Sequence, residues 1–244
     1  MRDILKRIFL VHKCVACRKI LGREDFDSAF CSSCKELYLA SKMSICSECS
    51  AEAEKCRCMP GFLKKDKALS LRRLFFYEKK RAGEPQNRLV YYLKKNKSKR
   101  VSLFVARELS TLINAERARL DIKGELILLG VPRSRGAFFE YGFDQADMLC
   151  REVSALTGIE YCRALKRRRK GREQKKLTAG ERRKNIKNLI YLDDVEAERM
   201  KGKTVVLIDD VVTTGASMSA CIQAVSKRGI KNVLCVAIAS DINT

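Results

Sequence analysis

Two neighbouring aspartates, Asp209 and Asp210, follow directly on an apolar run in the segment TVVLIDDVVTTGAS at residues 204–217. Adjacent carboxylates at the end of a buried strand repel each other and lose hydration, so a ligand or metal ion should compensate them. The next residues offer hydroxyls, a glycine that lets the backbone turn, and the free N–H groups of a following helix. We therefore predict a phosphate cradle beside two carboxylates that grip vicinal sugar hydroxyls, directly or through Mg²⁺. The alternative is that Asp210 only caps a turn.

Eight of the twelve cysteines lie within residues 14–58, in four closely spaced pairs. A Cys-x-x-Cys pair lets two thiolates reach one ion from a tight turn, and two pairs complete a tetrahedron. The predicted ligands of two structural Zn²⁺ sites are Cys14, Cys17, Cys31, Cys34, Cys46, Cys49, Cys56 and Cys58. Sequential pairing of the first four and the last four is the simplest arrangement. A cross-braced arrangement, His12 as a replacement ligand and an iron–sulfur cluster are the alternatives.

The net charge of +22 is concentrated in two segments of the chain. Residues 64–100 carry 14 basic and 3 acidic side chains, and residues 163–187 carry 13 basic and 2 acidic ones, so each segment has a net charge of +11. This pattern favours a polyanionic partner, either nucleic acid or a phosphorylated metabolite. A surface that only improves solubility is the alternative interpretation.

Apolar content and apolar run lengths indicate the class of protein. Hydrophobic residues make up 46% of the 244 residues, which is enough for a packed core. No apolar run approaches the roughly 20 residues of a membrane span, and the run IFLV near the N-terminus is shorter than the core of about 7–15 residues in a signal peptide. We expect a cytoplasmic protein without membrane insertion, where clustered cysteines hold metal rather than form disulfides.

The order of the predicted elements indicates an α/β fold. We expect strands over residues 71–79, 125–132, 204–210 and 232–240, and helices over residues 88–120, 143–158 and 217–229. Strands that alternate with helices predict a parallel sheet with helices on its faces. The predicted domains are a double zinc ribbon over residues 1–60, a linker over 61–75 and the sheet domain over 76–244. The first of these has too few apolar residues for a core of its own, although residues 1–13 could form a short docking helix.

The segment VLIDDVVTTGAS resembles the phosphoribosyl pyrophosphate (PRPP) motif of type I phosphoribosyltransferases. Two further segments, together with the double zinc module, resemble the ComF-type competence proteins. GFDQADML at residues 142–149 is similar to the family's Arg-Gly-Phe-Asn-Gln-Ala stretch, although Tyr141 stands where the family usually has Arg and Asp144 where it has Asn. The family's Gln-x-x-Leu-Ser-x-x-x-Arg-x-x-Asn segment is matched by Gln174, Leu177, Thr178, Arg182 and Asn185. The resemblance spans nearly the whole chain and is weakest over residues 61–100.

The resemblance implies a role for individual residues. Asp209 and Asp210 would be the catalytic pair that holds the ribose 2- and 3-hydroxyls. The 5-phosphate loop would be lined by Val212, Thr213, Thr214, Gly215, Ala216 and Ser217. Pyrophosphate would contact the loop formed by Val131, Pro132, Arg133, Ser134 and Arg135, where arginine supplies bidentate donors. The basic segment KRRRKGREQKKL at residues 166–177 would take the place of the family's mobile loop over the reaction centre.

Three functions remain open at this point. The resemblance implies an enzyme that transfers phosphoribose from Mg²⁺-bound PRPP to a nitrogen acceptor and releases pyrophosphate. The second hypothesis is a non-catalytic competence factor for DNA uptake. Its zinc ribbons and basic segments would contact single- or double-stranded DNA, it would work with DNA-processing proteins, and PRPP would be a regulatory ligand. The third is a PRPP-binding regulator without turnover. The sequence identifies neither the acceptor nor the oligomeric state.

Overall fold

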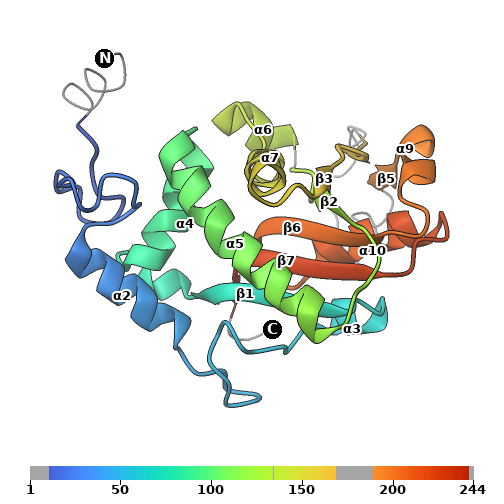
Figure 1. Ribbon diagram of the computed structural model, residues 1–244, viewed down its shortest axis with the longest axis horizontal. Coiled ribbons are helices and arrows are strands. Elements are labelled where there is room, and N and C mark those ends of the chain that lie inside the picture. The colour runs from blue at the N-terminus through green and yellow to red at the C-terminus, as the bar shows by residue number, and fades with distance from the viewer. Residues whose placement is uncertain (1–10, 134, 169–188, 242–244) are drawn as a thin grey trace, which may run out of the picture.

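A five-stranded parallel β-sheet lies at the centre of the computed structural model, which describes residues 11–133, 135–168 and 189–241 (Figure 1). All four strand pairings in this sheet are parallel. In spatial order the strands are β1 (Ser70–Tyr77), β7 (Val233–Asp241), β6 (Thr204–Val212), β2 (Leu126–Gly130) and β3 (Glu160–Tyr161). The predicted α/β architecture with a parallel sheet is confirmed.

Helices cover both faces of this sheet (Figure 1). One face carries α4 (Pro85–Lys95), α5 (Lys99–Arg119) and α7 (Gln145–Thr157), and the other carries α10 (Ala216–Ser226) and α3 (Gly61–Lys65). The remaining elements are α2 (Ser32–Lys42), the 3-10 turn η1 (Lys79–Arg81), α6 (Arg135–Tyr141), α9 (Asp194–Arg199) and an antiparallel hairpin of β4 (Leu165–Arg167) and β5 (Ile190–Leu192). Among the described residues, none of the helices has the length and hydropathy needed to cross a bilayer.

The central strands are apolar because both of their faces are buried. In β6, Val206 and Ile208 belong to the core beneath α5 and α7, whereas Val205 and Leu207 belong to the core beneath α10. Successive side chains of a strand point to opposite faces, so a strand covered on both sides reads as a continuous apolar run. This is why the sequence predicts β2, β6 and β7 clearly.

Local capping residues set the bounds of the helices. The helical pattern predicted over residues 88–120 is two helices, because Ser98 caps the start of α5 by accepting a hydrogen bond from the backbone N–H of Val101 at 3.5 Å. Asp144 caps α7 in the same way, and Gly158 ends it in the left-handed conformation with φ of 72°. The predicted end of α7 at Gly158 is confirmed.

The segment predicted as a linker over residues 61–75 contains regular structure. Helix α3 occupies its first part, and β1 begins within it at Ser70. Leu63, Leu71 and Leu74 are fully buried, so these apolar side chains hold the segment on the sheet despite the lysines between them. The high net charge of this segment led to its prediction as a linker, although its leucines are buried. The lysines point outward while the leucines point inward.

The two cysteine-rich modules both pack against strand β1. Its neighbouring residues Phe75 and Phe76 point in opposite directions, and each enters the apolar cluster of a different module. Tyr38 of α2 packs edge-on against Phe75 with 6.0 Å between the ring centroids, while Phe76 packs with Cys46 and Cys56. The modules share their cores with the sheet. Most of the short helix predicted within residues 1–13 lies outside the described residues.

A buried ion pair joins β1, α5 and the second cysteine module. Glu116 of α5 is fully buried and pairs with Arg72 of β1 and with Arg119 at 2.6 Å. Arg72 also donates to the backbone carbonyl of Glu54 in the module. Burial alone would raise the pKa of Glu116, but the donors from Arg119 and Arg72 outweigh it and lower the pKa to about 2.

We predict that Glu116→Gln lowers the free energy of unfolding by about 3 kcal/mol at pH 7, because it leaves buried guanidinium charge unpaired. The folded-state pKa of Glu116 is depressed from 4.5, so its contribution is present above pH 4.5 and is lost as the pH falls toward 2. Urea unfolding of both proteins over this range should show the difference shrinking. Glu198→Gln, which removes the exposed partner of Lys201, is the control and should cost less than about 0.5 kcal/mol.

Candidate functional site

The aspartate pair lies at the carboxyl edge of the sheet, where β6 extends beyond its neighbour β2. The pairing of β2 with β6 ends at Gly130 and Ile208, one residue before Asp209, whereas pairing with β7 continues to Val212. The strand is therefore two residues longer than the predicted range of 204–210. Because β2 has already ended, the edge beside the two carboxylates is open, which is where parallel sheets bind ligands.

The charge of this pair is only partly compensated. Asp209 accepts a hydrogen bond from the backbone N–H of Asp210 at 2.8 Å, and Asp210 accepts one from the N–H of Val211 at 2.6 Å. Desolvation and the neighbouring Asp210 charge raise the pKa of Asp209 well above its ordinary value, with Lys94 opposing them. Lys94 Nζ lies 3.6 Å from the Asp210 carboxylate. Both carboxylates thus keep acceptor oxygens for a ligand.

Sequence reasoning missed Lys94 as a site residue. It comes from the last turn of α4, more than 100 residues before the aspartates in the chain. Its sequence context, a lysine pair at the end of an amphipathic helix, is typical of a helix C-terminus and carries no signal for a site. Only the packing of α4 on the sheet brings it to Asp210.

A small pocket follows the aspartates at the start of α10. Its volume is about 220 Å³, and its lining consists of Asp209 and residues 211–218. Gly215 has a φ of +75°, a conformation that favours glycine, and directs the chain into α10. The side chains of Thr213 and Thr214 are exposed, and the Thr214 hydroxyl accepts a hydrogen bond from the N–H of Ala216 at 3.4 Å. The start of the helix and these hydroxyls form a site suited to a phosphate.

A larger cleft of about 420 Å³ opens beside the pair and is bounded by the segment after β2. The backbone N–H of Arg133 donates to Asp144 at 3.2 Å, and its guanidinium lies 4.6 Å from the ring centroid of Tyr141. The structure therefore brings Arg133 to the same cleft as Asp209 and Asp210. Arg135 begins α6, and Ser134 lies outside the described residues.

Tyr141 and Asp144, the two departures from the family pattern, both contact this loop. Asp144 accepts hydrogen bonds from the N–H groups of Ala146 at 3.0 Å and Asp147 at 3.3 Å, so it caps α7 as an asparagine would. Tyr141 supplies an aromatic face under the guanidinium of Arg133, a cation–π contact. Tyr141 and Asp144 therefore both contact Arg133 and help to position the loop that carries it.

The buried side chain of Gln145 indicates that the cleft is suited to a polar ligand. It lines the cleft and is only 3% exposed, and its Nε2 has no hydrogen-bond partner among the described residues. A buried amide donor without an acceptor is costly, so a bound polar group would relieve it. Next to it, Gly130 lets α7 come close to β2, since a Cβ there would lie 3.1 Å from the backbone carbon of Ala146.

A second cavity of about 570 Å³ adjoins the cleft and shares Pro132, Arg133, Asp144 and Arg167 with it. Aromatic rings from α6 and the hairpin line this cavity, with Phe138 and Tyr191 on its sides. The mobile loop predicted over residues 166–177 begins in β4 and continues mostly outside the described residues.

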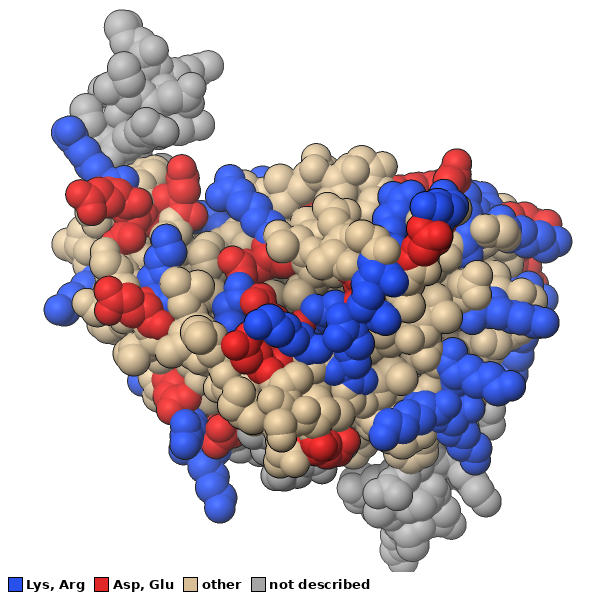
Figure 2. Space-filling view, turned by 60° about the horizontal axis from the view of Figure 1, so that its bottom comes forward, with Lys and Arg blue, Asp and Glu red and all other residues tan. Residues whose placement is uncertain are grey.

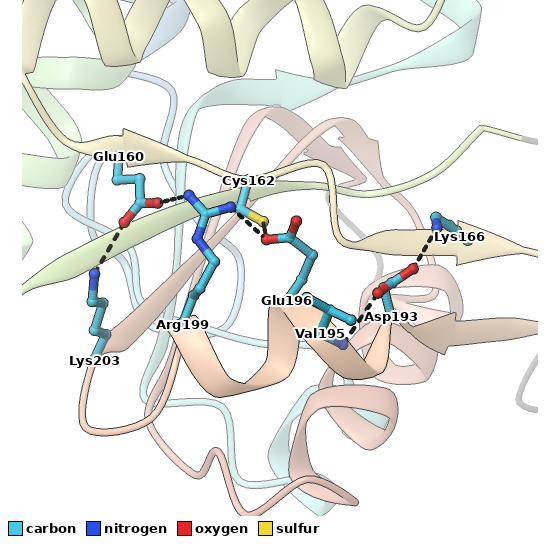
Figure 3. Close-up of polar contacts among 8 residues, drawn as sticks. All are labelled: Glu160, Cys162, Lys166, Asp193, Val195, Glu196, Arg199 and Lys203. Atoms are coloured by element: carbon cyan, nitrogen blue, oxygen red, sulfur yellow. Dashed lines mark hydrogen bonds and ion pairs between the residues drawn. The ribbon is translucent and has the colours of Figure 1, made fainter.

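A chain of polar contacts attaches α9 to β3 and to Cys162, which follows β3 (Figure 3). Glu196 of α9 accepts a hydrogen bond from the Cys162 thiol at 2.9 Å and pairs with Arg199 at 2.7 Å. Arg199 also pairs with Glu160 of β3, which Lys203 contacts at 3.0 Å. These contacts hold α9 against β3, the edge strand of the sheet.

The eight cysteines of the N-terminal region form two separate clusters. The four Sγ atoms of each cluster lie within 4.8 Å of one another, and the members are Cys14, Cys17, Cys31 and Cys34 in the first and Cys46, Cys49, Cys56 and Cys58 in the second. The structure thus has the sequential pairing. His12 instead packs against the ring of Phe26, with 4.4 Å between the centroids.

The geometry of both clusters fits a tetrahedral metal site. Sulfurs bound to one Zn²⁺ at about 2.3 Å would lie about 3.8 Å apart, and the Sγ atoms of Cys17 and Cys31, like those of Cys49 and Cys56, are 3.6 Å apart. Burial opposes ionisation of Cys14 and Cys46, but backbone N–H donors outweigh it and lower the pKa of each thiol to about 7. The two clusters can therefore hold metal ions.

Comparison with known proteins agrees with this geometry. Residues 146–243, which include β6 and α10, match the family described as "Phosphoribosyl transferase domain". Competence protein F of Haemophilus influenzae is 26% identical over 151 residues, which cover 62% of this chain and 66% of that protein. The chain is thus similar in part to a ComF-type competence protein. The DNA utilization protein YhgH of Escherichia coli O157:H7 is 27% identical over 150 residues.

These similarities cover only part of the chain and part of each relative. The match with YhgH covers 61% of this chain and spans about 64% of that protein. Among solved structures, the allosteric regulatory enzyme of purine biosynthesis matches with a TM-score of 0.40 and 16% identity over 61% of this chain and 30% of its own. Hypoxanthine phosphoribosyltransferase from Trypanosoma cruzi matches with a TM-score of 0.36 and 14% identity over 58% of this chain and 78% of its own.

The raised pKa of Asp209 leads to a stability prediction. Because the folded state disfavours the charged carboxylate, the group destabilises the fold once the pH exceeds its unfolded value of 3.8. Asp209→Asn should raise the melting temperature of the ligand-free protein at pH 7, by about 2–4 °C for each kcal/mol of relief. The gain should vanish below pH 3.8, where both states are protonated.

Thermal unfolding followed by circular dichroism across this pH range measures the effect. Asp121→Asn, which changes a carboxylate that is 74% exposed, is the control and should leave the melting temperature unchanged. A lower melting temperature for Asp209→Asn at pH 7 would contradict the prediction.

Proposed function

We propose that this chain binds PRPP in the cleft at the carboxyl edge of the sheet and transfers its phosphoribosyl group to a nitrogen acceptor, releasing pyrophosphate. The observation that carries the proposal is the position of the two aspartates. They lie between a glycine turn at a helix N-terminus and a loop with Arg133, all opening into adjoining pockets. These three features match the three parts of PRPP, which are a sugar diol, a phosphate and a diphosphate.

Each part of PRPP has a proposed set of contacts. The 5-phosphate would occupy the pocket at the start of α10, where N–H groups and threonine hydroxyls donate. The ribose hydroxyls would donate to Asp209 and Asp210. Pyrophosphate would lie toward Arg133 and Lys94, because a diphosphate needs strong cationic donors. Mg²⁺ bound with PRPP would supply further positive charge at the diphosphate.

The proposed reaction is a substitution at the anomeric carbon of ribose. The bond from this carbon to the pyrophosphate oxygen breaks, and its electron pair leaves with pyrophosphate. A lone pair of the acceptor nitrogen forms the new bond, and the proton that this nitrogen loses passes to solvent. Positive charge develops on the ring during the step, so the fixed carboxylates of Asp209 and Asp210 would stabilise it electrostatically.

The second cavity is the proposed place of the acceptor. It shares Arg133 and Arg167 with the cleft, so a planar ring inside it would lie next to the departing pyrophosphate. Phe138 and Tyr191 offer aromatic surfaces for such a ring. The two cysteine clusters are the proposed sites of structural Zn²⁺, since each offers four thiolates and leaves no ligand position for water.

A thermal-shift titration tests PRPP binding. PRPP with Mg²⁺ should raise the melting temperature of the wild-type protein, because binding adds about 2.7 kcal/mol to its stability at a ligand concentration of 100 times Kd. The double variant Asp209→Asn with Asp210→Asn should lose this shift, whereas Asp121→Asn should keep it. Ribose 5-phosphate, which lacks the diphosphate, should shift the wild type less. No shift with PRPP in the wild type would overturn the proposal.

A screen for pyrophosphate release with a panel of nucleobases and ammonia separates the enzyme from a PRPP-binding regulator. Release that depends on one acceptor supports the transferase. Binding without release with any acceptor supports a regulatory PRPP site.

A second candidate function is binding of DNA, with PRPP as a regulatory ligand. Exposed aromatic rings beside cations favour it. Tyr91 is 60% exposed with Lys95 Nζ 4.4 Å from its ring centroid, and Arg168 lies 5.1 Å from the ring centroid of Tyr191. In the view of Figure 2, lysine and arginine side chains gather on the side of the molecule away from the cysteine modules. Bases stack on such rings while lysines contact phosphates, and two relatives are named for competence and DNA utilization.

Fluorescence anisotropy with labelled single- and double-stranded oligonucleotides tests this candidate. The logarithm of the affinity should fall steeply and linearly with the logarithm of salt concentration. Tyr91→Ala should weaken single-strand binding by the roughly 1–3 kcal/mol of one stacked base, and Tyr91→Phe should retain it. Equal loss in both variants, or no binding at low salt, would exclude Tyr91 as a stacking platform.

A further inference from the structure

We propose that helix α3 positions the phosphate loop at the start of α10, and that metal in the second cysteine cluster fixes α3 in place. Metal in this cluster would then strengthen PRPP binding, whereas metal in the first cluster would not. The inference rests on the proposed PRPP site for its effect on affinity, but the positioning itself can be tested without PRPP.

The second cluster is joined to α3 by very little chain. A single residue, Met59, separates the ligand Cys58 from Pro60, which caps the start of α3 with a φ of −53°. The carbonyl of Pro60 accepts hydrogen bonds from the N–H groups of Leu63 at 2.9 Å and Lys64 at 3.2 Å. On the cluster side, the carbonyl of Cys58 accepts a hydrogen bond from Arg73 of β1. A metal bound at Cys58 therefore determines where α3 begins.

Helix α3 lies directly against the turn of the phosphate loop. A Cβ built on Gly215 would lie 3.2 Å from Leu63 Cγ and 3.2 Å from Pro60 Cβ. Leu63 is fully buried, so this contact belongs to the core. Movement of α3 would release the left-handed turn that directs the loop into α10.

A carboxylate at the end of α3 ties the same helix to α10. Asp66 accepts hydrogen bonds from Gln223 Nε2 at 2.9 and 3.0 Å and another from the hydroxyl of Ser219. Ser219 lies in the first turn of α10, whose free N–H groups would bind the phosphate. Pro60 and Leu63 thus hold the turn, and Asp66 holds the helix that follows it.

The first cluster is attached elsewhere and serves as an internal comparison. Its module packs on α4 and α5, where Phe30 contacts Phe104 with 5.8 Å between the ring centroids and Arg100 donates to the carbonyl of Lys13 at 3.1 Å. Among the described residues, none of the close contacts to Gly215 comes from this module. Loss of its metal should therefore affect stability without a matching effect on the loop.

Calorimetric titration of the full chain with Mg²⁺ and PRPP tests the coupling. Cys49→Ser and Cys17→Ser are matched variants, because each removes the most exposed cysteine of its cluster. We expect Cys49→Ser to weaken PRPP binding about tenfold or more, within the usual range of coupling between sites, and Cys17→Ser to change it less than about twofold. Equal effects of both variants, or no effect of Cys49→Ser, would overturn the inference.

Two variants test the positioning while leaving all eight cysteines in place. Asp66→Asn and Leu63→Ala should keep two bound metal ions per chain, measured by a colorimetric metal assay after denaturation, and should still weaken PRPP binding. Asp66→Glu should recover part of the affinity lost in Asp66→Asn, because it restores the carboxylate. Unchanged affinity in both Asp66→Asn and Leu63→Ala would show that α3 does not position the loop.

Hydrogen exchange of the ligand-free protein separates this inference from the proposed function. In Cys49→Ser, amides of residues 211–219 should exchange at least about tenfold faster than in the wild type, while those of β2 keep their rates. Faster exchange in Cys49→Ser, together with a wild-type protein that binds no PRPP, would overturn the proposed function and keep the positioning. Unchanged exchange in Cys49→Ser would overturn the positioning whether or not PRPP binds.

Discussion

The site depends on the electrostatic cost of holding two adjacent carboxylates at the end of a buried strand. The fold meets this cost in part, through backbone N–H donors to Asp209 and Asp210 and through the ammonium of Lys94. The carboxylates that remain uncompensated lie beside an open cleft and near cationic side chains. Strand β2 ends early, so the pair opens into a cleft, and cationic side chains such as Arg133 line its far wall. A ligand that supplies hydroxyl donors and phosphates matches this arrangement.

The sequence predicts the parts of the molecule whose signals are local. Buried parallel strands are apolar runs, and the residues proposed to bind phosphate and sugar lie together after one of them. The sequence could therefore identify β6 and its loop directly. Lys94, α3 and β3 could not. Lys94 has no local signal and reaches Asp210 only through helix packing, α3 is masked by surrounding lysines, and β3 is a two-residue strand set by pairing with β2.

The cysteine modules depend on the sheet for part of their cores. Each has too few apolar side chains for a core of its own, and each completes one with a neighbouring phenylalanine of β1. The buried contacts of Arg72 with Glu116 and with the carbonyl of Glu54 add a polar link between the second module and the sheet. The N-terminal region and the sheet region therefore form one packed unit in the described part of the chain.

Cleft and cavity have a wall in common, formed by Pro132, Arg133, Asp144 and Arg167. The side chains of this shared wall take one arrangement at a time, so a ligand in the cleft and a ligand in the second cavity contact the same conformation. A ligand bound in one of the two spaces would fix the guanidinium groups of Arg133 and Arg167, and would thereby change the shape of the other space. Occupancy of the two pockets is therefore coupled, because both depend on the positions of the same two guanidinium groups.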